Sequence, residues 1–437
     1  MSWRSSSSRA RRLRALAVLL VCAAAVAPVR VPDDPPSDWI DPDTGHRVIR
    51  LSTEPGSTTL YFHDNAYTPD GDRYVFNGPS GIMLVDVTTL GTSPPKPELI
   101  VPRGGGAYMA RRTREVYYAQ RTPGAPRGAG GEVYAYNVDS RRTRRVPYAT
   151  RTLINADETF TVAPIVAADP SGKTPRPAPR EPRPQLARMF PGKAMAELTP
   201  EQQYAVTKEE GLARRALNPD PMAFVFTNLK SGKADTVGYQ YGWLNHMQFN
   251  PKDPNLLLYC HEGTWHEVDR IWTIRTDGSE MTLRHRRGMD MEIAGHELWS
   301  WDGQTIWYDL QTPRSQVFWI AGVNIATGQR TQYKIDRDAW SVHYNVSRDD
   351  SLFMGDGGDE TQVAFAPNGR WINLFTVQRD GTLKRERLVN MKDHNYVTGR
   401  GGVEPNGSIT PDKRWVIFTG NFHGARHVYA VSTDRAR

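Results

Sequence analysis

Two stretches decide the fold: HMQFNPKDPNLLLYCHEG (residues 246–263) and HELWSWDGQTIWYDL (residues 296–310). Each begins with a histidine, passes through a short strand pattern, turns at an acidic residue and continues as an apolar strand. After a second turn, each is followed by a further strand of alternating pattern. Short strands separated by Pro, Asp and Gly turns in a recurring order are typical of an all-β repeat. The two stretches therefore predict two successive blades of a β-propeller.

The same pattern of short strands and turns recurs seven times, with a spacing of about 55 residues. The repeats begin near His63, Ala107, Leu153, His246, His296, His343 and Asn406. The fold class predicted is all-β, a seven-bladed β-propeller. A propeller must close its ring so that its first and last sheets expose no edge. We expect residues 46–52, HRVIRLS, to supply the outer strand of the seventh blade.

The third repeat is interrupted at about residues 169–218. A Pro/Arg-rich stretch occupies residues 169–186, where prolines exclude a central strand. Residues 194–217 have the composition and start signals of a helix. The prediction is a partly helical insertion in blade three. It forms either a lid or wall on one face, or a surface excursion without a role.

The first 27 residues predict a secretory signal peptide. Five arginines precede the apolar run Ala15–Ala25, which is too short to span a membrane. Residues 28–45 are then a linker and residues 46–437 the propeller. We expect export to the periplasm or the extracellular space. A lipoprotein linked through Cys22 is the alternative, which the bulky Val21 disfavours.

Removing residues 1–27 changes both the charge and the cysteine count. The formal charge falls from +7 to +2, so the mature chain lacks the excess positive charge typical of nucleic-acid-binding proteins. Only Cys260 is left, which excludes an intrachain disulfide. We expect no transmembrane segment in the mature chain. The sequence does not specify the oligomeric state.

Four histidines occupy equivalent positions in the repeat, and we call them the histidine row. His63 and His246 lie seven residues before an aspartate, and His296 and His343 lie six before one; Asn406 has the same place in the last repeat. The first strand of each propeller blade lines the central channel, so these side chains should converge at one mouth of it. Converging imidazoles suit a metal site or proton transfer near neutral pH. Alternatively, each histidine simply caps its own loop.

Two further clusters have ordinary explanations. Cys260-His261-Glu262 has no standard zinc spacing, and Cys260 after LLLY is expected to be a buried structural cysteine. The loop Gly355–Glu360 is acidic and could bind a cation or form a plain turn. The sequence has no G-x-S-x-G elbow, phosphate loop or H-E-x-x-H motif, so hydrolase, nucleotide and metalloprotease functions lose their main support.

Four segments resemble a known family: LNHMQFNPKDPNLLLYCHEGTW, MEIAGHELWSWDG, SVHYNVSRDDSLFMGDGG and EPNGSITPDKRWVIFTG. They are similar to the oligogalacturonate lyases, propeller enzymes that cleave short pectin fragments by β-elimination. The resemblance covers blades four to seven best. It implies a manganese ion held by three histidines and a glutamine, with a further histidine as the base.

The resemblance assigns roles one position at a time. His296 and His343 match two metal histidines, and His246 matches the base. The third metal histidine falls in a family segment His-Pro-His-Pro-Ser, where this chain has Glu404 and Asn406 in place of the two histidines. No residue is placed on the glutamine ligand, and Trp340 stands near its position. Two imidazoles with carboxylate or amide oxygens can hold manganese or a calcium-like cation.

The function expected is a polysaccharide lyase acting on uronic-acid oligosaccharides by metal-assisted β-elimination. Arg314, in the loop LQTPRSQVFW, is the expected partner for a sugar carboxylate, because a guanidinium binds a carboxylate through two hydrogen bonds. Trp243, Trp265 and Trp340 could stack on sugar rings. The substrate could also be another uronate polymer, such as ulvan, glucuronan or a rhamnose-containing pectin. The alternative is a non-catalytic propeller that binds a glycan or a partner protein in the cell envelope.

Overall fold

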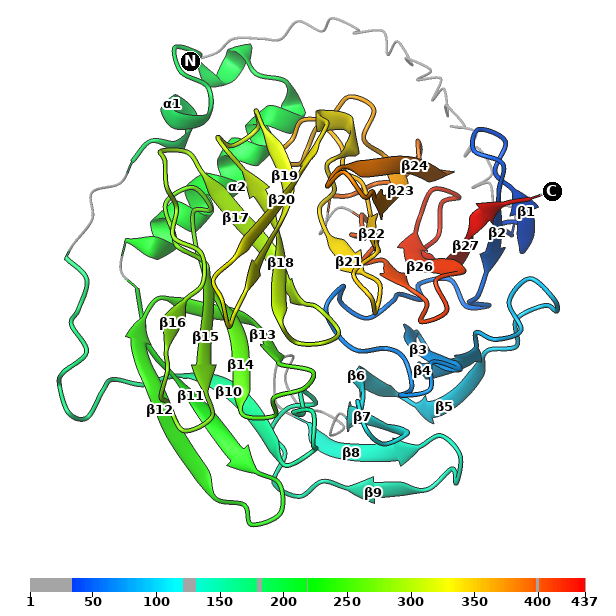
Figure 1. Cartoon of the computed structure of the whole chain (residues 1–437), viewed down its shortest axis with the longest axis horizontal. Helices are drawn as coiled ribbons and strands as arrows, with labels where there is room; N and C mark the ends of the chain where they lie inside the picture. Colours follow the sequence, from blue (N-terminus) through cyan, green and yellow to red (C-terminus); the bar gives the residue numbers. More distant parts are fainter. Residues whose placement is uncertain (1–33, 121–130, 179–182, 218, 398–400, 437) are drawn as a thin grey trace, which may run out of the picture. The chain divides into compact units, whose positions relative to one another are not determined.

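The computed structural model describes residues 34–120, 131–178, 183–217, 219–397 and 401–436. Residues 35–437 form one compact unit. The predicted signal peptide lies outside the described residues. In the compact unit the sheets follow one another around a common centre in chain order (Figure 1), which confirms the seven-bladed propeller. Within the described residues, no helix has the length and apolar character needed to cross a membrane.

Six blades consist of antiparallel strands that follow one another in the chain. Blade 1 contains β3 (Arg73–Gly78), β4 (Gly81–Asp86) and β5 (Glu98–Pro102). Blade 2 contains β6 (Gly104–Met109), β7 (Glu115–Gln120), β8 (Glu132–Asn137) and β9 (Thr143–Arg145). Blade 3 contains β10 (Phe160–Val166), β11 (Pro221–Asn228) and β12 (Ala234–Tyr241).

The next three blades have four strands each. Blade 4 contains β13 (Trp243–Phe249), β14 (Leu256–Glu262), β15 (Ile271–Arg275) and β16 (Thr282–Leu283). Blade 5 contains β17 (Ile293–Trp299), β18 (Thr305–Gln311), β19 (Phe318–Asn324) and β20 (Arg330–Ile335). A short 3-10 helix, η2 (Arg337–Ala339), leads to blade 6, which contains β21 (Tyr344–Val346), β22 (Leu352–Gly355), β23 (Trp371–Val377) and β24 (Leu383–Asn390).

Blade 7 joins the two ends of the propeller. It contains, from the inside outward, β25 (Ser408–Ile409), β26 (Trp415–Gly420), β27 (His427–Arg435), β2 (His46–Arg50) and β1 (Asp38–Ile40). β2 pairs antiparallel with β27, with Val48 opposite Val431, so the predicted closing strand is confirmed. β1 lies within the segment expected as a linker and adds a fifth strand outside β2.

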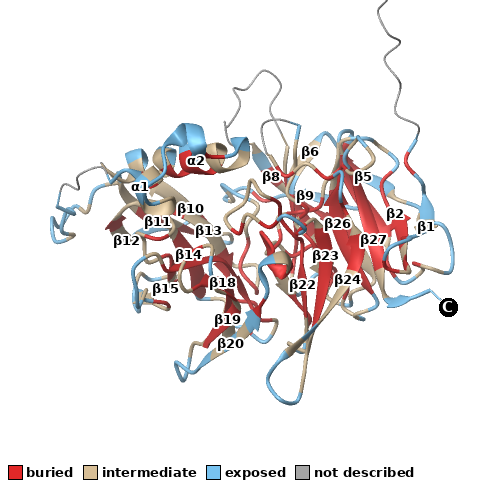
Figure 2. Cartoon of the chain, turned by 90° about the horizontal axis from the view of Figure 1, so that it is seen from above, coloured by how far each residue is buried: buried red, intermediate tan, exposed pale blue. Residues whose placement is uncertain are grey.

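The insertion in blade three folds into α1 (Gln185–Met189), the 3-10 turn η1 (Met195–Glu197) and α2 (Pro200–Ala216). A capping box starts α2: the Thr199 hydroxyl accepts a hydrogen bond from the Gln202 N–H, and the Gln202 side chain accepts one from the Thr199 N–H. Ala205, Val206 and Glu209 are its buried residues. Figure 2 shows α2 lying across one edge of the sheets, near β10, β13 and β14.

The core consists of apolar clusters packed between neighbouring blades. The largest joins residues of blades 5, 6 and 7 and includes Val48 from the closing strand. Trp307 is buried in this cluster, whereas Trp272 and Trp319 pack against two smaller ones. Cys260 is buried in β14 and unpaired, as predicted. Because apolar side chains pack tightly against both faces of the inner strands, the residues at the ends of these strands have fixed positions.

Candidate active site

Two histidines of the row, His246 and His296, are placed by the same backbone irregularity in the innermost strands of blades 4 and 5. Register shifts interrupt β13 between Asn245 and Gln248 and β17 between Gly295 and Leu298. Inside these bulges His246 and His296 have φ angles of 49° and 50°, and Asn406 ahead of β25 has 49°. Non-glycine residues rarely adopt such angles, and bulges that re-aim side chains gather at functional sites.

The structure brings the four histidines of the row together. The rings of His296 and His343 have centroids 4.6 Å apart, and those of His246 and His296 are stacked at 6.0 Å. The His63 ring lies 5.8 Å from that of His246. Tyr61 packs against three of these rings. The convergence expected from the repeat spacing is therefore present in the folded chain.

His343 is held by a buried carboxylate. Its Nδ1 lies 2.8 Å from Asp356 Oδ2, and its backbone N–H donates to Asp356 Oδ1 at 2.8 Å. Burial acts to lower the pKa of His343, but Asp356 and Glu404 raise it above its ordinary value. Nε2, on the other side of the ring, has no hydrogen-bond partner among the described residues and lies 3.8 Å from Glu404 Oε2. A carboxylate on one ring nitrogen with the other left open is the arrangement usual for metal-binding histidines.

His296 is also buried and remains neutral. Burial, together with His343, His246, Arg270 and Lys208, lowers its pKa well below the ordinary value. Its Nδ1 is buried, and no residue in the described part of the chain forms a hydrogen bond with it. Trp265 packs edge-on against the ring, with centroids 4.8 Å apart. A neutral imidazole with an unused nitrogen is competent as a ligand.

His246 lies between a carboxylate and a phenol. Its Nδ1 is 3.2 Å from Glu297 Oε1, and its Nε2 is 3.3 Å from the Tyr61 hydroxyl. Burial would raise the pKa of Glu297, but its hydrogen bond to His246 and the charge of Arg270 lower it. An ionised Glu297 accepts a hydrogen bond from Nδ1–H, so the lone pair of Nε2 faces Tyr61. Burial, with Glu404, Glu262 and Glu297 nearby, raises the pKa of Tyr61 well above its usual value.

His246, Cys260 and Glu262 form a second group beside this histidine. Their ligand atoms all lie within 4.8 Å of one another and could hold a metal ion. A cation of the protein is already there, because Arg270 Nη1 lies 2.6 Å from Glu262 Oε1 and Nη2 3.6 Å from Cys260 Sγ. Burial would raise the pKa of Glu262, but Arg270 and His246 lower it to about 2.

The other residues singled out in the sequence lie close by, in different settings. Glu404 and Arg314 line the same small cavity of about 50 Å³ as His296. The Arg314 guanidinium lies 2.9 Å from His266 Nδ1 and 3.1 Å from Glu209 Oε1 of α2. The Asn406 amide oxygen accepts from the Phe62 N–H at 3.2 Å, and its NH₂ donates to the Glu404 carbonyl. Trp340 is buried and donates to Asp309.

Several residues of the site were not predicted from the sequence. Tyr61 and Phe62 stand directly before His63, and Glu297 directly after His296, so proximity to the row was their signal. Asp356 belongs to the acidic loop 355–360, where it orients His343. Lys208 and Glu209 of α2 line the cavity with His296, and no local pattern indicated that the insertion would reach this far.

Comparisons with known proteins agree with this fold. A family model described as oligogalacturonate lyase matches residues 217–436. An oligogalacturonide lyase of Pectobacterium atrosepticum is 27% identical over 228 residues, which cover 47% of this chain and 56% of that protein. An oligogalacturonate lyase of Dickeya dadantii is 28% identical over 223 residues, with the same coverage. The chain thus spans about half the length of these curated relatives.

Solved structures extend the similarity of fold to nearly the whole chain. An oligogalacturonate lyase in complex with manganese superposes with a TM-score of 0.66 at 20% identity, covering 90% of this chain and 95% of that one. One from Vibrio parahaemolyticus gives 0.66 at 18% identity, covering 91% and 96%. The family model matches half of this sequence, over the blades that hold His246, His296 and His343. The chain belongs to the oligogalacturonate lyase family.

Proposed function

We propose that the protein is a lyase that cleaves uronic-acid oligosaccharides by β-elimination with the help of a divalent cation such as manganese. One observation supports this most: His343, oriented by Asp356, directs an open ring nitrogen toward Glu404, beside His296 and the His246–Glu297 pair. This arrangement joins a candidate cation site to a candidate base. Family membership and the manganese complex of a similar structure support the same proposal.

Two of the proposed donors, His343 and Glu404, are spaced to share a divalent cation, whereas His296, His343 and Glu404 together do not have the mutual 4.8 Å spacing that His246, Cys260 and Glu262 show among the described residues. His343 Nε2 and His296 Nδ1 are buried and unpartnered, and the carboxylate of Glu404 is 3.8 Å from the first. Two ligands at about 2.1 Å from one ion stand roughly 3–4 Å apart, so this separation suits a shared ion. These three residues are preferred over the Cys260 group, where Arg270 already neutralises the anions. Bound there, the cation would neutralise the charge that develops on the sugar carboxylate.

His246 is the proposed base. With Nδ1–H donated to Glu297, the lone pair of Nε2 can accept the proton at C5 of the uronate. The electrons of that C–H bond form the C4=C5 double bond as the bond between C4 and the glycosidic oxygen breaks. A positioned base of this kind contributes roughly 10²–10⁴-fold to the rate.

Tyr61 is the proposed source of the proton for the leaving oxygen. Its hydroxyl stays protonated because burial and three carboxylates raise its pKa, and it lies 3.3 Å from His246 Nε2. The phenol donates its proton to the departing oxygen and regains one from the His246 imidazolium. The net result is one proton moved from C5 to the leaving group. Both residues return to their starting states.

The sequence features at the N-terminus support a further proposal, that the protein is exported. The arginines and apolar run within residues 1–27 fit a signal peptide, and periplasmic or extracellular location suits an enzyme acting on plant-derived uronates.

The proposal is tested by supplying the purified protein with manganese and a panel of uronate oligosaccharides. The panel includes galacturonate, glucuronate and rhamnose-containing oligomers, and the ultraviolet absorbance of the unsaturated product is followed. We expect product from at least one galacturonate oligomer. Absence of product from every substrate would leave the non-catalytic propeller as the remaining function. A His296→Ala variant should lose bound manganese, and unchanged metal content would place the cation elsewhere.

A further inference from the structure

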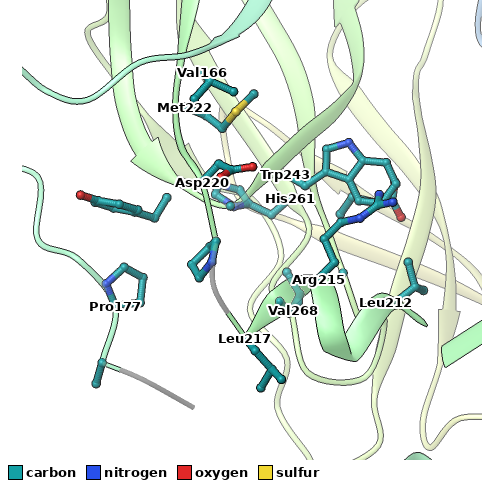
Figure 3. A pocket seen from close by; sticks show the side chains of 17 residues that line it. Val166, Pro177, Leu212, Arg215, Leu217, Asp220, Met222, Trp243, His261 and Val268 are labelled. Carbon is teal, nitrogen blue, oxygen red and sulfur yellow. The ribbon is translucent and has the colours of Figure 1, made fainter. Parts of the chain in front are cut away.

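A second, larger cavity lies between the insertion and blades 3 and 4, beside the candidate active site. It has a volume of about 420 Å³. Its apolar wall consists of Val166, Leu212, Leu217, Met222 and Val268. Figure 3 shows Arg215, Trp243 and His261 projecting toward the same space. Cavities of this volume with a few convergent polar groups are the usual form of small-ligand sites.

Arg215 is held in an orientation suited to an anion. Its guanidinium lies 4.0 Å from the centroid of the Trp243 ring, which stacks on the guanidinium face. Stacking leaves the N–H groups, which lie in the guanidinium plane, free to form hydrogen bonds. Within the described part of the chain no carboxylate pairs with them. Arg215 can therefore bind a carboxylate through two parallel hydrogen bonds without losing its contact with Trp243.

His261 supplies a hydrogen-bond acceptor to the same cavity. The Gln240 NH₂ donates to the Gly238 carbonyl, which fixes the Gln240 amide oxygen as the acceptor for the His261 ring. His261 Nε2 is 2.6 Å from that oxygen and therefore bears the proton. The lone pair remains on Nδ1, which can accept a hydrogen bond from a hydroxyl group. The guanidinium of Arg215, the apolar wall and the acceptor on His261 together match a uronate ring. The carboxylates of Asp220 and Glu262 also line the cavity, and Glu262 is paired with Arg270.

One face of α2 connects this cavity to the histidine site. Ala205, Lys208 and Glu209 line the cavity with His296, whereas Leu212, Arg215 and Ala216 line the larger one. Residues three or four apart share a helix face, so α2 follows both cavities in series. Lys208 and Arg215 are separated by about 10 Å along the axis, at 1.5 Å per residue. Glu262 lines the larger cavity and also lies 3.9 Å from His246.

We infer that this cavity binds a further uronate residue of the same oligosaccharide, beyond the two that flank the scissile bond, with its carboxylate on Arg215, so that the insertion favours substrates longer than a dimer. The inference rests on the proposed function for the identity of the sugar. It assigns the insertion a direct role as a wall of the substrate groove. His261 contributes a hydroxyl contact, and the apolar wall packs against the C–H face of the ring.

The test is equilibrium binding, measured by calorimetry, of tetragalacturonate and digalacturonate to the full chain bearing His246→Ala, which is not expected to cleave them. Adding Arg215→Gln should weaken tetragalacturonate binding about tenfold, because a charge-assisted pair is lost. Trp243→Leu should act in the same direction, and Trp243→Phe should retain most of the affinity because it keeps the stacking ring. Arg214→Gln, one residue away on α2 and outside both cavities, is the matched control.

The outcomes separate this inference from the proposed function. Tetragalacturonate affinity within twofold of the parent after Arg215→Gln overturns the inference, as does absence of tetragalacturonate binding to the parent. An equal loss with Arg214→Gln also overturns it, since the effect would then be one of general charge. Wild-type protein that binds tetragalacturonate through Arg215 without releasing unsaturated product contradicts the lyase proposal and supports the inference.

Discussion

At the scale of single residues, Asp356 organises one side of the site by accepting three hydrogen bonds. Its carboxylate accepts from Nδ1 and the backbone N–H of His343 and from the backbone N–H of Asn406. The carboxylate thereby fixes the His343 ring and the strand entrance that bears Glu404. We expect Asp356→Asn to weaken manganese binding about 10–100-fold, the cost usual for removing such an orienting partner.

This loss is measured by titrating metal-free protein with manganese. Asp359→Asn is the matched control, because Asp359 is equally buried in the same loop but binds Thr361 and Arg370. Equal manganese affinity in the Asp356→Asn variant and the wild type would show that His343 is not oriented for a metal. Thermal unfolding of both variants separates a local effect from a general loss of structure.

Glu297 fixes the tautomer of the base and therefore controls its function. A glutamine at this position can present its NH₂ to Nδ1, so the ring proton moves to Nε2 and no lone pair faces the substrate. We expect Glu297→Gln to lower kcat at least about 100-fold, within the range for loss of general base catalysis, with a smaller change in KM. Glu292→Gln is the control, since Glu292 pairs with His285 away from the site. An unchanged kcat in the Glu297 variant would remove His246 from the mechanism.

At the scale of elements, a buried ion pair attaches α2 to the propeller. Glu209 Oε1 lies 3.1 Å from Arg314 Nη2, and both side chains are almost fully buried. Removing one charge leaves the other buried and uncompensated, which lowers the free energy of unfolding by roughly 3–5 kcal/mol. We expect Glu209→Gln to raise the hydrogen-exchange rate of the α2 amides at least tenfold. Exchange in α2 as slow as in the wild type, or an equal effect from Arg214→Gln, would show that other contacts hold the helix.

The elements also show what sequence could and could not predict. The helix was predictable because Thr199, Pro200 and Gln202 form its start signal locally. Its place over the histidines was not, because Glu209 and Arg314 are far apart in the chain and neither residue type specifies the other. The histidine row was predictable from spacing alone. The bulges that aim His246 and His296 were not, since a positive φ is uncommon even for histidine.

At the scale of the whole molecule, the closing strand β2 decides whether the ring is complete. Val48 is fully buried between blades, opposite Val431. We expect Val48→Ala to lower the free energy of unfolding by about 2 kcal/mol, the combined cost of lost burial and a cavity. Ile40→Ala on β1, where Ile40 is 47% exposed, should change it much less. Equal thermal stability of the Val48 variant and the wild type would mean that closure of the ring by β2 contributes little to stability.

Stability should also depend on pH through buried histidines remote from the proposed base. His394 Nε2 donates to the Val403 carbonyl and Nδ1 accepts from the Asn421 N–H, and burial lowers the pKa of this histidine to about 4. Between pH about 6.5 and 4 the unfolded chain binds a proton here that the folded chain does not, so stability falls as pH falls. The full effect is roughly 3 kcal/mol.

Thermal unfolding of the His394→Gln variant between pH about 6.5 and 4 tests whether His394 makes the protein less stable as the pH falls. The variant should be less stable near neutral pH, because it loses one of the two hydrogen bonds, but its melting temperature should fall less steeply on acidification. A slope as steep as that of the wild type would assign the acid sensitivity to other groups.

In the proposed reaction, His246 removes a proton from a cation-bound uronate. The most direct measurement is the initial rate of unsaturated product formed from trigalacturonate by metal-free protein resupplied with manganese, compared with His246→Ala under the same conditions. We expect measurable turnover by the wild type, and at least about a 100-fold lower rate in a variant that still binds manganese. No product from the wild type, or an undiminished rate in the variant, would contradict the account.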